Sequence, residues 1–171
     1  MATICLCLAA GLMLRSTLAR SLGADLLSIH SPDNHKIFAL LRQLNSIPTR
    51  SCLNDRNDFK FPWKRGTITQ MQGTQRTCFR HLMLQQTFEL FTTEHSRAAW
   101  NRTVLYQLLS SLHHSLERLD GTEDESLACR YLESLVREYF QGIRDYLEER
   151  KYSPCAWEVV RVQIARRLLL V

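Results

Sequence analysis

The sequence predicts an all-α protein, a single domain in which five helices form a bundle. Along five segments the apolar residues recur at intervals of three and four, which is typical of a helix that buries one face. Alternation of apolar and polar residues is hard to find, and 6 glycines with 4 prolines supply few turns for a β fold. The 171 residues, 45% of them hydrophobic, are enough to bury one core.

The first stretch predicts export. Residues 2–14 form an apolar run of signal-peptide length that is too short to span a bilayer. Thr17 and Ala19 suit the positions three and one before a cleavage site, and Ser21 with Gly23 offers a second site. We therefore expect a signal peptide over residues 1–22, with cleavage near 19–23, and a secreted domain over residues 23–171. The alternative is a retained, buried amphipathic helix.

A first helix and a long connection come next. Ser31-Pro32-Asp33 is a helix-start signal, and Pro48 ends the helix. The apolar residues at helical spacing between them are Ile37, Leu40, Leu41 and Leu44. From Thr49 to Gly73 the pattern is broken, which predicts a long first connection. Three of its aromatic residues alternate with polar ones and are expected to hold it to the domain: Phe59, Phe61 and Trp63.

Three further helices follow in the chain. A second is predicted over residues 74–92, a third after Ala98-Ala99-Trp100, and a fourth after a turn at 120–125. Residues 146–152 are expected to turn into the last helix. The in-phase residues are Phe79, Leu82, Met83, Gln86, Leu90 and Phe91 in the second helix; Val104, Leu105, Leu108, Leu112 and Leu116 in the third; and Leu127, Tyr131, Leu135, Tyr139, Phe140, Ile143 and Leu147 in the fourth.

The last helix carries two stripes. Ser153 followed by Pro154 starts it, because the hydroxyl can accept from a free backbone amide and proline suits the first turn. The apolar stripe is Trp157, Val160, Ile164, Leu168 and Val171, and the mixed stripe is Glu158, Arg161, Val162, Ala165, Arg166 and Leu169. The mixed stripe is too polar for a core, so we interpret the helix as half core and half contact surface.

The cysteine count fits an oxidising compartment. Cys5 and Cys7 lie in the predicted signal peptide, which leaves Cys52, Cys78, Cys129 and Cys155 for two bridges. Four cysteines allow three connectivities. A zinc site is the competing use, but none of the four has a second cysteine two to four residues away.

Charge and motifs argue against several other functions. The net charge is only +5, with 17 acidic residues mixed among 22 basic ones, so we expect no nucleic-acid partner. No paired histidines with a glutamate in zinc-site spacing, Gly-rich phosphate loop or Gly-x-Ser-x-Gly elbow occurs in the sequence. We therefore expect no enzyme activity, no metal site and no cofactor.

Three motifs resemble those of type I interferons. Residues 152–161, Tyr-Ser-Pro-Cys-Ala-Trp-Glu-Val-Val-Arg, are similar to the family's signature. Residues 52–59 with Phe61-Pro62 resemble its first-loop motif, and residues 84–93 with Ala98-Ala99-Trp100 resemble its second helix and the segment after that helix. The resemblance covers residues 37–169 in the family's order. The short carboxyl end most resembles the short trophoblast-type, delta-like subclass.

The resemblance implies a secreted, monomeric helical cytokine with up-up-down-down topology. Such a protein binds both chains of the type I interferon receptor and triggers JAK–STAT signalling and an antiviral response. Beyond residues 2–14, no apolar segment of the sequence is long and uncharged enough to anchor the protein, so we expect no insertion into a membrane. The resemblance also implies a bridge between Cys52 and Cys155, which leaves Cys78 and Cys129 as the second pair.

The family's receptor contacts carry over to two faces. The residues for the high-affinity chain are Leu53, Asp55, Arg56, Asp58, Arg161, Val162, Ala165, Arg166 and Leu169, with Phe38 and Ala39 departing from the family's pattern. Those for the low-affinity chain are Phe88, Glu89, Val104, Leu109, His113 and Arg137. We expect Arg56 and Arg161 to carry a large share of the affinity, because arginine is enriched among interface hot spots.

Three alternatives share parts of this pattern. Another secreted helical cytokine or growth factor would act on a different receptor, an intracellular helical adaptor would retain the first apolar run, and a membrane-active protein would need a continuous cationic face. Asn101-Arg102-Thr103 is the one glycosylation sequon of the sequence. If the protein is exported, we expect Asn101 to be modified.

Overall fold

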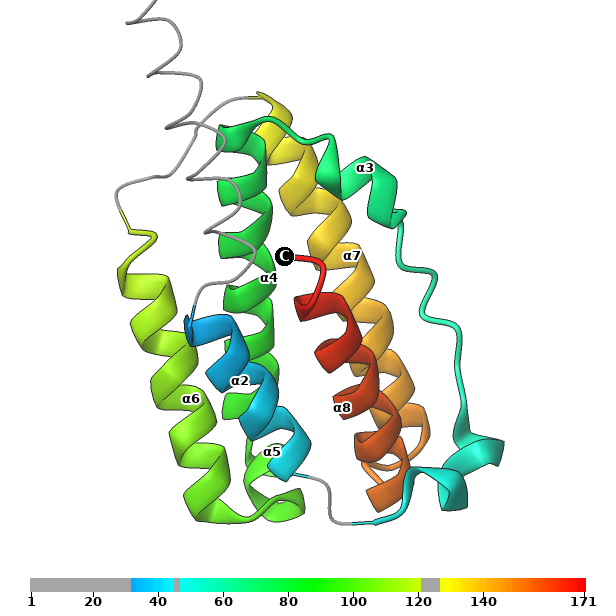
Figure 1. Cartoon of the computed structure of the whole chain (residues 1–171). Coiled ribbons are helices and arrows are strands. Elements are labelled where there is room, and N and C mark those ends of the chain that lie inside the picture. The colour runs from blue at the N-terminus through cyan, green and yellow to red at the C-terminus, as the bar shows by residue number, and fades with distance from the viewer. Residues whose placement is uncertain (1–31, 45–46, 121–126) are drawn as a thin grey trace, which may run out of the picture. The chain divides into compact units, whose positions relative to one another are not determined.

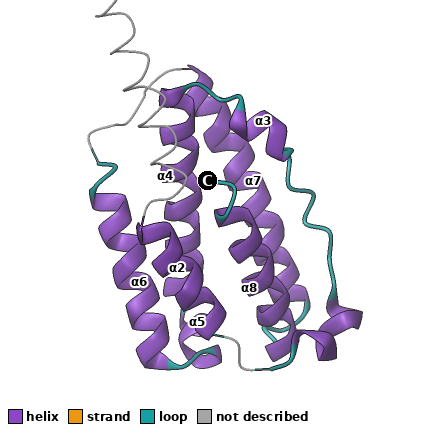
Figure 2. Cartoon of the chain, in the orientation of Figure 1, coloured by secondary structure: helices purple, strands orange, loops and turns teal. Residues whose placement is uncertain are grey.

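The computed structural model describes residues 32–44, 47–120 and 127–171, and residues 33–171 form one compact unit. All regular structure in these ranges is helical (Figures 1 and 2). The predicted all-α fold is confirmed. The predicted signal peptide and the predicted turn over residues 121–125 lie outside the described residues.

Five helices occupy the segments that the periodicity predicts: α2 (Pro32–Gln43), α4 (Gly73–Thr92), α6 (Arg102–Glu117), α7 (Leu127–Glu149) and α8 (Pro154–Leu168). α8 begins as expected, because the Ser153 side chain accepts from the backbone N–H of Ala156 and Pro154 occupies the first turn. α7 continues through Tyr146, where the sequence predicts a turn. Their up-up-down-down order stays a prediction.

Three short helices were not predicted: η1, a 3₁₀ helix (Thr49–Asp55), α3 (Arg65–Thr69) and α5 (Glu94–Ala99). The longest of them, η1, has 7 residues, so none presents a repeating apolar face. α5 has a sequence signal in its first cap, where the Thr93 side chain accepts from the N–H of Ser96.

The core lies between α2, α4, α6, α7 and α8. α4 packs against α6 and α7, and both α4 and α7 contact α8 (Figure 1). α2 joins them through bonds from Arg80 on α4 to Asn34 and from Arg161 on α8 to the carbonyl of Leu41. The largest fully buried side chains are Trp157, Phe79, Phe91, Phe140, Ile37, Leu41, Met83, Leu84, Leu90, Leu108, Leu112 and Ile143.

The fourth predicted helix needs one adjustment. Its predicted stripe includes Tyr131, which is 66% exposed. The buried face of α7 instead includes Leu132, Val136 and Tyr146, besides the expected Tyr139.

The first connection is held along α7, as its three aromatic residues predicted. The ring of Phe59 lies 5.1 Å from that of Tyr146, and the ring of Phe61 lies 5.0 Å from that of Tyr139. Trp63 packs against Phe79 of α4 at 4.7 Å. The connection thus runs antiparallel to α7 from η1 to α3 (Figure 1).

Two disulfides cross-link the unit. Cys52–Cys155 joins η1 to α8, and Cys78–Cys129 joins the start of α4 to the start of α7. The pairing implied by the resemblance, Cys52 with Cys155, is therefore present, and so is the bridge between the two remaining cysteines.

Candidate functional site

The first candidate surface is formed by η1, the residues just after it and α8, and we call it the η1–α8 face. η1 is tied to the rest of the protein at three points. At its start, the Thr49 hydroxyl donates to Oε1 of Glu158 at 2.6 Å. In its middle is the Cys52–Cys155 disulfide. At its end, the hydroxyl of Tyr146 donates to the carbonyl of Asp55 at 2.6 Å.

The contact of Tyr146 with Asp55 is supported by an ion pair. Arg150 lies 3.6 Å from the carboxylate of Asp55, and its guanidinium sits over the ring of Tyr146. Burial, with the neighbouring carboxylate of Asp55, raises the pKa of the Tyr146 phenol, so its hydroxyl keeps the proton that it donates. Asp55 is therefore half-buried and engaged within the protein.

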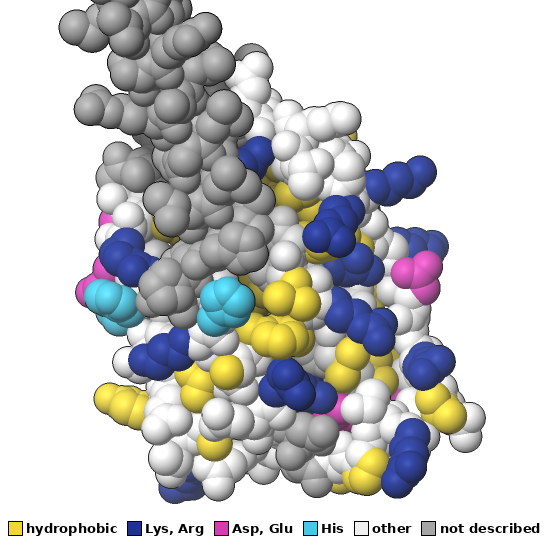
Figure 3. Space-filling view, in the orientation of Figure 1, with side chains coloured by type: hydrophobic (Ala, Val, Ile, Leu, Met, Phe, Trp, Pro, Cys, Tyr) yellow, Lys and Arg dark blue, Asp and Glu magenta, His cyan; other side chains and the backbone are white. Residues whose placement is uncertain are grey.

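With the backbone of η1 held this way, its outer side chains face solvent. Leu53 is 50% exposed and Leu169, at the end of α8, is 57% exposed. Arg56, Asp58 and Arg166 are exposed as well, Val162 is half-buried and Ala165 is buried. Figure 3 shows basic and hydrophobic side chains interleaved over α8 and the first connection. Phe38 is half-buried and Ala39 exposed on α2.

Two members of the mixed stripe of α8 lie in the interior and not on the contact surface that the sequence predicts. Glu158 is 0% exposed and Arg161 is 5% exposed. Nε and Nη2 of Arg161 donate to the two oxygens of Glu158, both at 2.7 Å, and Nη1 donates to the carbonyl of Leu41 at 3.0 Å. η1 and the end of α2 cover this pair. The resemblance implies that Arg161 offers its guanidinium to a partner, but the structure turns it inward.

The second candidate surface lies across α6, α4 and α7, and we call it the α4 face. Phe88 of α4 is half-buried, with its ring 6.2 Å from that of His113 on α6. Val104 and Leu109 are half-buried on α6, and His113 pairs with Glu117 at 3.4 Å. This contact places Phe88 beside His113 on the surface that α4 and α6 share.

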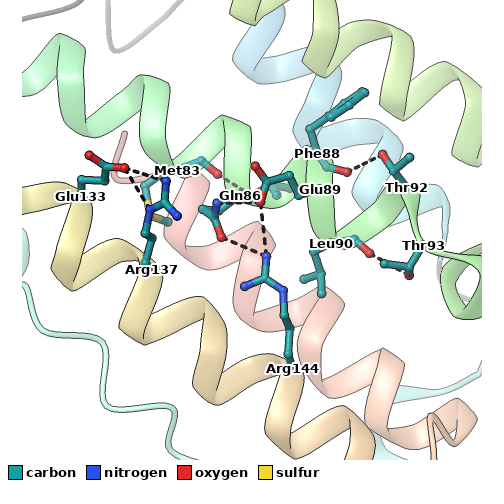
Figure 4. Close-up of polar contacts among 11 residues, drawn as sticks. Met83, Gln86, Phe88, Glu89, Leu90, Thr92, Thr93, Glu133, Arg137 and Arg144 are labelled. Carbon is teal, nitrogen blue, oxygen red and sulfur yellow. Dashed lines mark hydrogen bonds and ion pairs between the residues drawn. The ribbon is translucent and has the colours of Figure 1, made fainter.

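A polar cluster continues the α4 face onto α7 (Figure 4). Nη2 of Arg144 donates to Oε1 of Gln86 at 2.9 Å and lies 3.5 Å from Oε2 of Glu89. Gln86 in turn donates to the same Glu89 oxygen at 2.7 Å. Nearer the start of α7, Arg137 pairs with Glu133 at 2.7 Å.

Several residues that shape these faces were not predicted. On the η1–α8 face they are Thr49, which begins η1, and Tyr146 and Arg150, which contact Asp55 at its end. On the α4 face it is Arg144, which donates to Gln86. Their partners are distant in sequence; Thr49 and Glu158, for example, are separated by 109 positions. Periodicity within one segment carries no signal for such a pair.

The α6 side also has a groove. It occupies about 590 Å³ and is lined by Arg97, Arg102, Leu105, Tyr106 and Leu109, among others. Tyr106 is 75% exposed, and it belongs to no predicted stripe or contact set. Asn101 caps this helix: its side-chain oxygen accepts from the N–H groups of Thr103 and Val104, and the residue is exposed.

The described ranges were compared with two further kinds of structure, a metal-binding cluster and a membrane-spanning helix. No three or more His, Cys, Asp or Glu side chains there are grouped so as to hold a metal ion. Of the helices in the same ranges, none combines the length and apolar character needed to span a bilayer.

Comparisons with known proteins agree on one family. A model of the interferon alpha/beta domain matches residues 26–171. Interferon omega-1 of Homo sapiens is 45% identical over 157 residues, which cover 88% of this chain and 80% of that protein. Interferon alpha-17 of Homo sapiens is 44% identical over 155 residues, which cover 86% and 82%. The solved structure of zebrafish interferon 2 shares the fold, with a TM-score of 0.64 at 20% identity over 80% of this chain and 92% of that chain.

Proposed function

The chain belongs to the interferon alpha/beta family, and from this premise we propose that it is a secreted type I interferon that binds both chains of the interferon receptor. Members of this family are cytokines and not enzymes. Binding of the two chains would bring them together and start JAK–STAT signalling and an antiviral response. The delta-like subclass stays a prediction.

The observation that carries the proposal is the η1–α8 face. Two large apolar side chains, Leu53 and Leu169, stay exposed on elements whose backbones are held by a disulfide and buried bonds. A partner that covers these side chains would bury their apolar surface, and pre-ordered contact residues lose little freedom on binding. We therefore assign the high-affinity receptor chain to this face.

The α4 face supports the second receptor chain. It combines a half-buried aromatic residue, Phe88, with exposed charges at Glu89 and Arg137. Its charged side chains already pair with one another within the protein, so a receptor would have to compete for them, which fits the weaker of the two contacts.

The proposal is tested with purified protein on cells that lack one receptor chain. Wild-type cells should show STAT phosphorylation and an antiviral reporter signal. Cells that lack one of the two receptor chains, whichever it is, should show no STAT phosphorylation and no reporter signal. A response that persists without the type I receptor would instead favour a helical cytokine that uses a different receptor.

Arg56→Ala should weaken binding to the high-affinity chain at least roughly tenfold, because a truncated hot-spot arginine costs about 2 kcal/mol or more. Arg56 is exposed just after η1, and its backbone N–H bonds the carbonyl of Leu53. Surface plasmon resonance would measure the dissociation constant. Arg130→Ala is the matched control, because Arg130 is an exposed arginine near the start of α7, whereas η1 contacts α7 near its end, at Tyr146. This variant should bind as the parent does. Equal affinity of the two variants would remove Arg56 from the site.

Asn101 should carry an N-linked glycan when mammalian cells secrete the protein. The side-chain oxygen serves as the helix cap, which leaves the amide nitrogen available for attachment. Glycosidase treatment should then lower the apparent mass. Thr103→Ala is a better control than a substitution of Asn101, since it destroys the sequon and keeps the Asn101 cap. An unchanged mass for the treated parent would contradict this prediction.

A further inference from the structure

The buried pair of Glu158 and Arg161 contacts both ends of the chain segment that leads from α2 into η1. Nη1 of Arg161 donates to the carbonyl of Leu41, one of the last carbonyls of α2. Glu158 accepts from the hydroxyl of Thr49, the first residue of η1. A single ion pair on α8 thus caps one element and anchors the next.

The arrangement is more than an ordinary helical salt bridge. A Glu–Arg pair three residues apart would form equally well on an exposed helix surface, where it contributes a few tenths of a kcal/mol. Here both members are buried, and burial makes an unfilled hydrogen-bond position on either one costly. The pair is therefore satisfied only when Thr49 and Leu41 stand where they do, which selects one register of η1 on α8.

Resting on the proposed function, we propose that Glu158 is a positioning residue for the receptor-binding segment and acts through the hydroxyl of Thr49. Glu158 is wholly buried and cannot touch a receptor itself. Its bond to Thr49 lies three residues before Cys52 and four before Leu53, so the bond and the disulfide hold η1 at two neighbouring points. With both in place, Leu53 and Arg56 are presented in one arrangement. Without the Thr49 bond, the disulfide and the Tyr146 bond still hold the middle and the end of η1, but its start is released. The binding-competent arrangement is then less populated, which raises the apparent dissociation constant.

The proposal is tested at Thr49, because loss of its hydroxyl leaves the Glu158–Arg161 pair itself intact. Thr49→Val removes the hydroxyl and keeps the side-chain shape, and Thr49→Ser restores the hydroxyl. Two readouts are needed: the exchange rates of the Ser51 and Arg56 amides in the free protein, which bond Pro48 and Leu53, and the affinity for the high-affinity receptor chain. Thr77→Val is the matched control, since its hydroxyl bonds only within α4, to Gly73.

We expect Thr49→Val to speed exchange at both amides and to weaken receptor binding roughly fivefold or more, as the loss of a hydrogen bond to a charged group predicts. Thr49→Ser should return both values to those of the parent, and Thr77→Val should change neither. Weaker binding with unchanged exchange would mean that the hydroxyl touches the receptor directly, and would overturn the proposal. So would no change in either readout, or a failure of serine to restore them. If the parent binds no receptor chain, the proposed function fails, and the exchange rates alone decide whether the hydroxyl orders η1.

Discussion

Arg161→Ala should lower the free energy of unfolding by about 3–5 kcal/mol, the usual cost of removing one member of a buried ion pair. The substitution leaves the Glu158 carboxylate buried without its two arginine bonds and the Leu41 carbonyl without its donor. A loss of this size is a large share of a single domain's stability, which is about 5–15 kcal/mol. Urea unfolding followed by circular dichroism would measure the change.

The matched control is Arg166→Ala, an exposed arginine on the same helix, which should stay within about 0.5 kcal/mol of the parent. A double variant, Glu158→Met with Arg161→Leu, should recover much of the loss, because apolar residues of similar volume avoid the burial of charge. If Arg161→Ala unfolds at the same urea concentration as Arg166→Ala, the buried pair contributes nothing to stability. Because Arg161→Ala is expected to be partly unfolded, its affinity for the receptor should be calculated from the concentration of folded protein only.

The two disulfides should differ in the effect of their loss. Replacing Cys52 and Cys155 by serine opens a link across a sequence separation of 103, worth about 4–5 kcal/mol on the chain-entropy account. Replacing Cys78 and Cys129 opens one across 51, worth about 4 kcal/mol on the same account. The stability losses should therefore be similar, as thermal unfolding would show.

Receptor affinity separates the two variants. Loss of the Cys52–Cys155 bridge removes one of the two ties between η1 and α8 and should weaken binding to the high-affinity chain. Loss of the Cys78–Cys129 bridge acts between the starts of α4 and α7, away from the η1–α8 face. Affinity should be measured at a temperature at which both variants are folded. A loss of affinity in the Cys78/Cys129 variant equal to that in the Cys52/Cys155 variant would contradict the assignment of that face.

The fold was predictable where a helix was long enough to repeat its pattern. The apolar stripe of α8 is buried as predicted, from Trp157 through Ile164 to Val171, because three or four turns reveal which side faces the core. η1, α3 and α5 escaped prediction because seven residues or fewer make no repeat. Their boundaries are set by caps and by packing against other elements.

The sequence predicted which residues of α8 belong to the candidate site better than it predicted which of them are buried and which are exposed. Periodicity showed that Glu158, Arg161 and Leu169 share one side of α8, and the structure agrees. It could not show that η1 covers the first two and leaves the third in water, because the covering residue Thr49 lies 109 positions away. The sequence predicts a contact surface along the whole stripe, whereas the charges of Glu158 and Arg161 are paired with each other inside the protein.

The order of the bridges along the chain has a consequence for proteolysis. Cys52 and Cys78 precede every peptide bond between positions 78 and 129, and their partners Cys129 and Cys155 follow all of them. A protease that cuts once anywhere in that interval produces two fragments joined by both disulfides. The nicked molecule remains a single covalent species with each fragment fastened to the other at two places, and only reduction separates them.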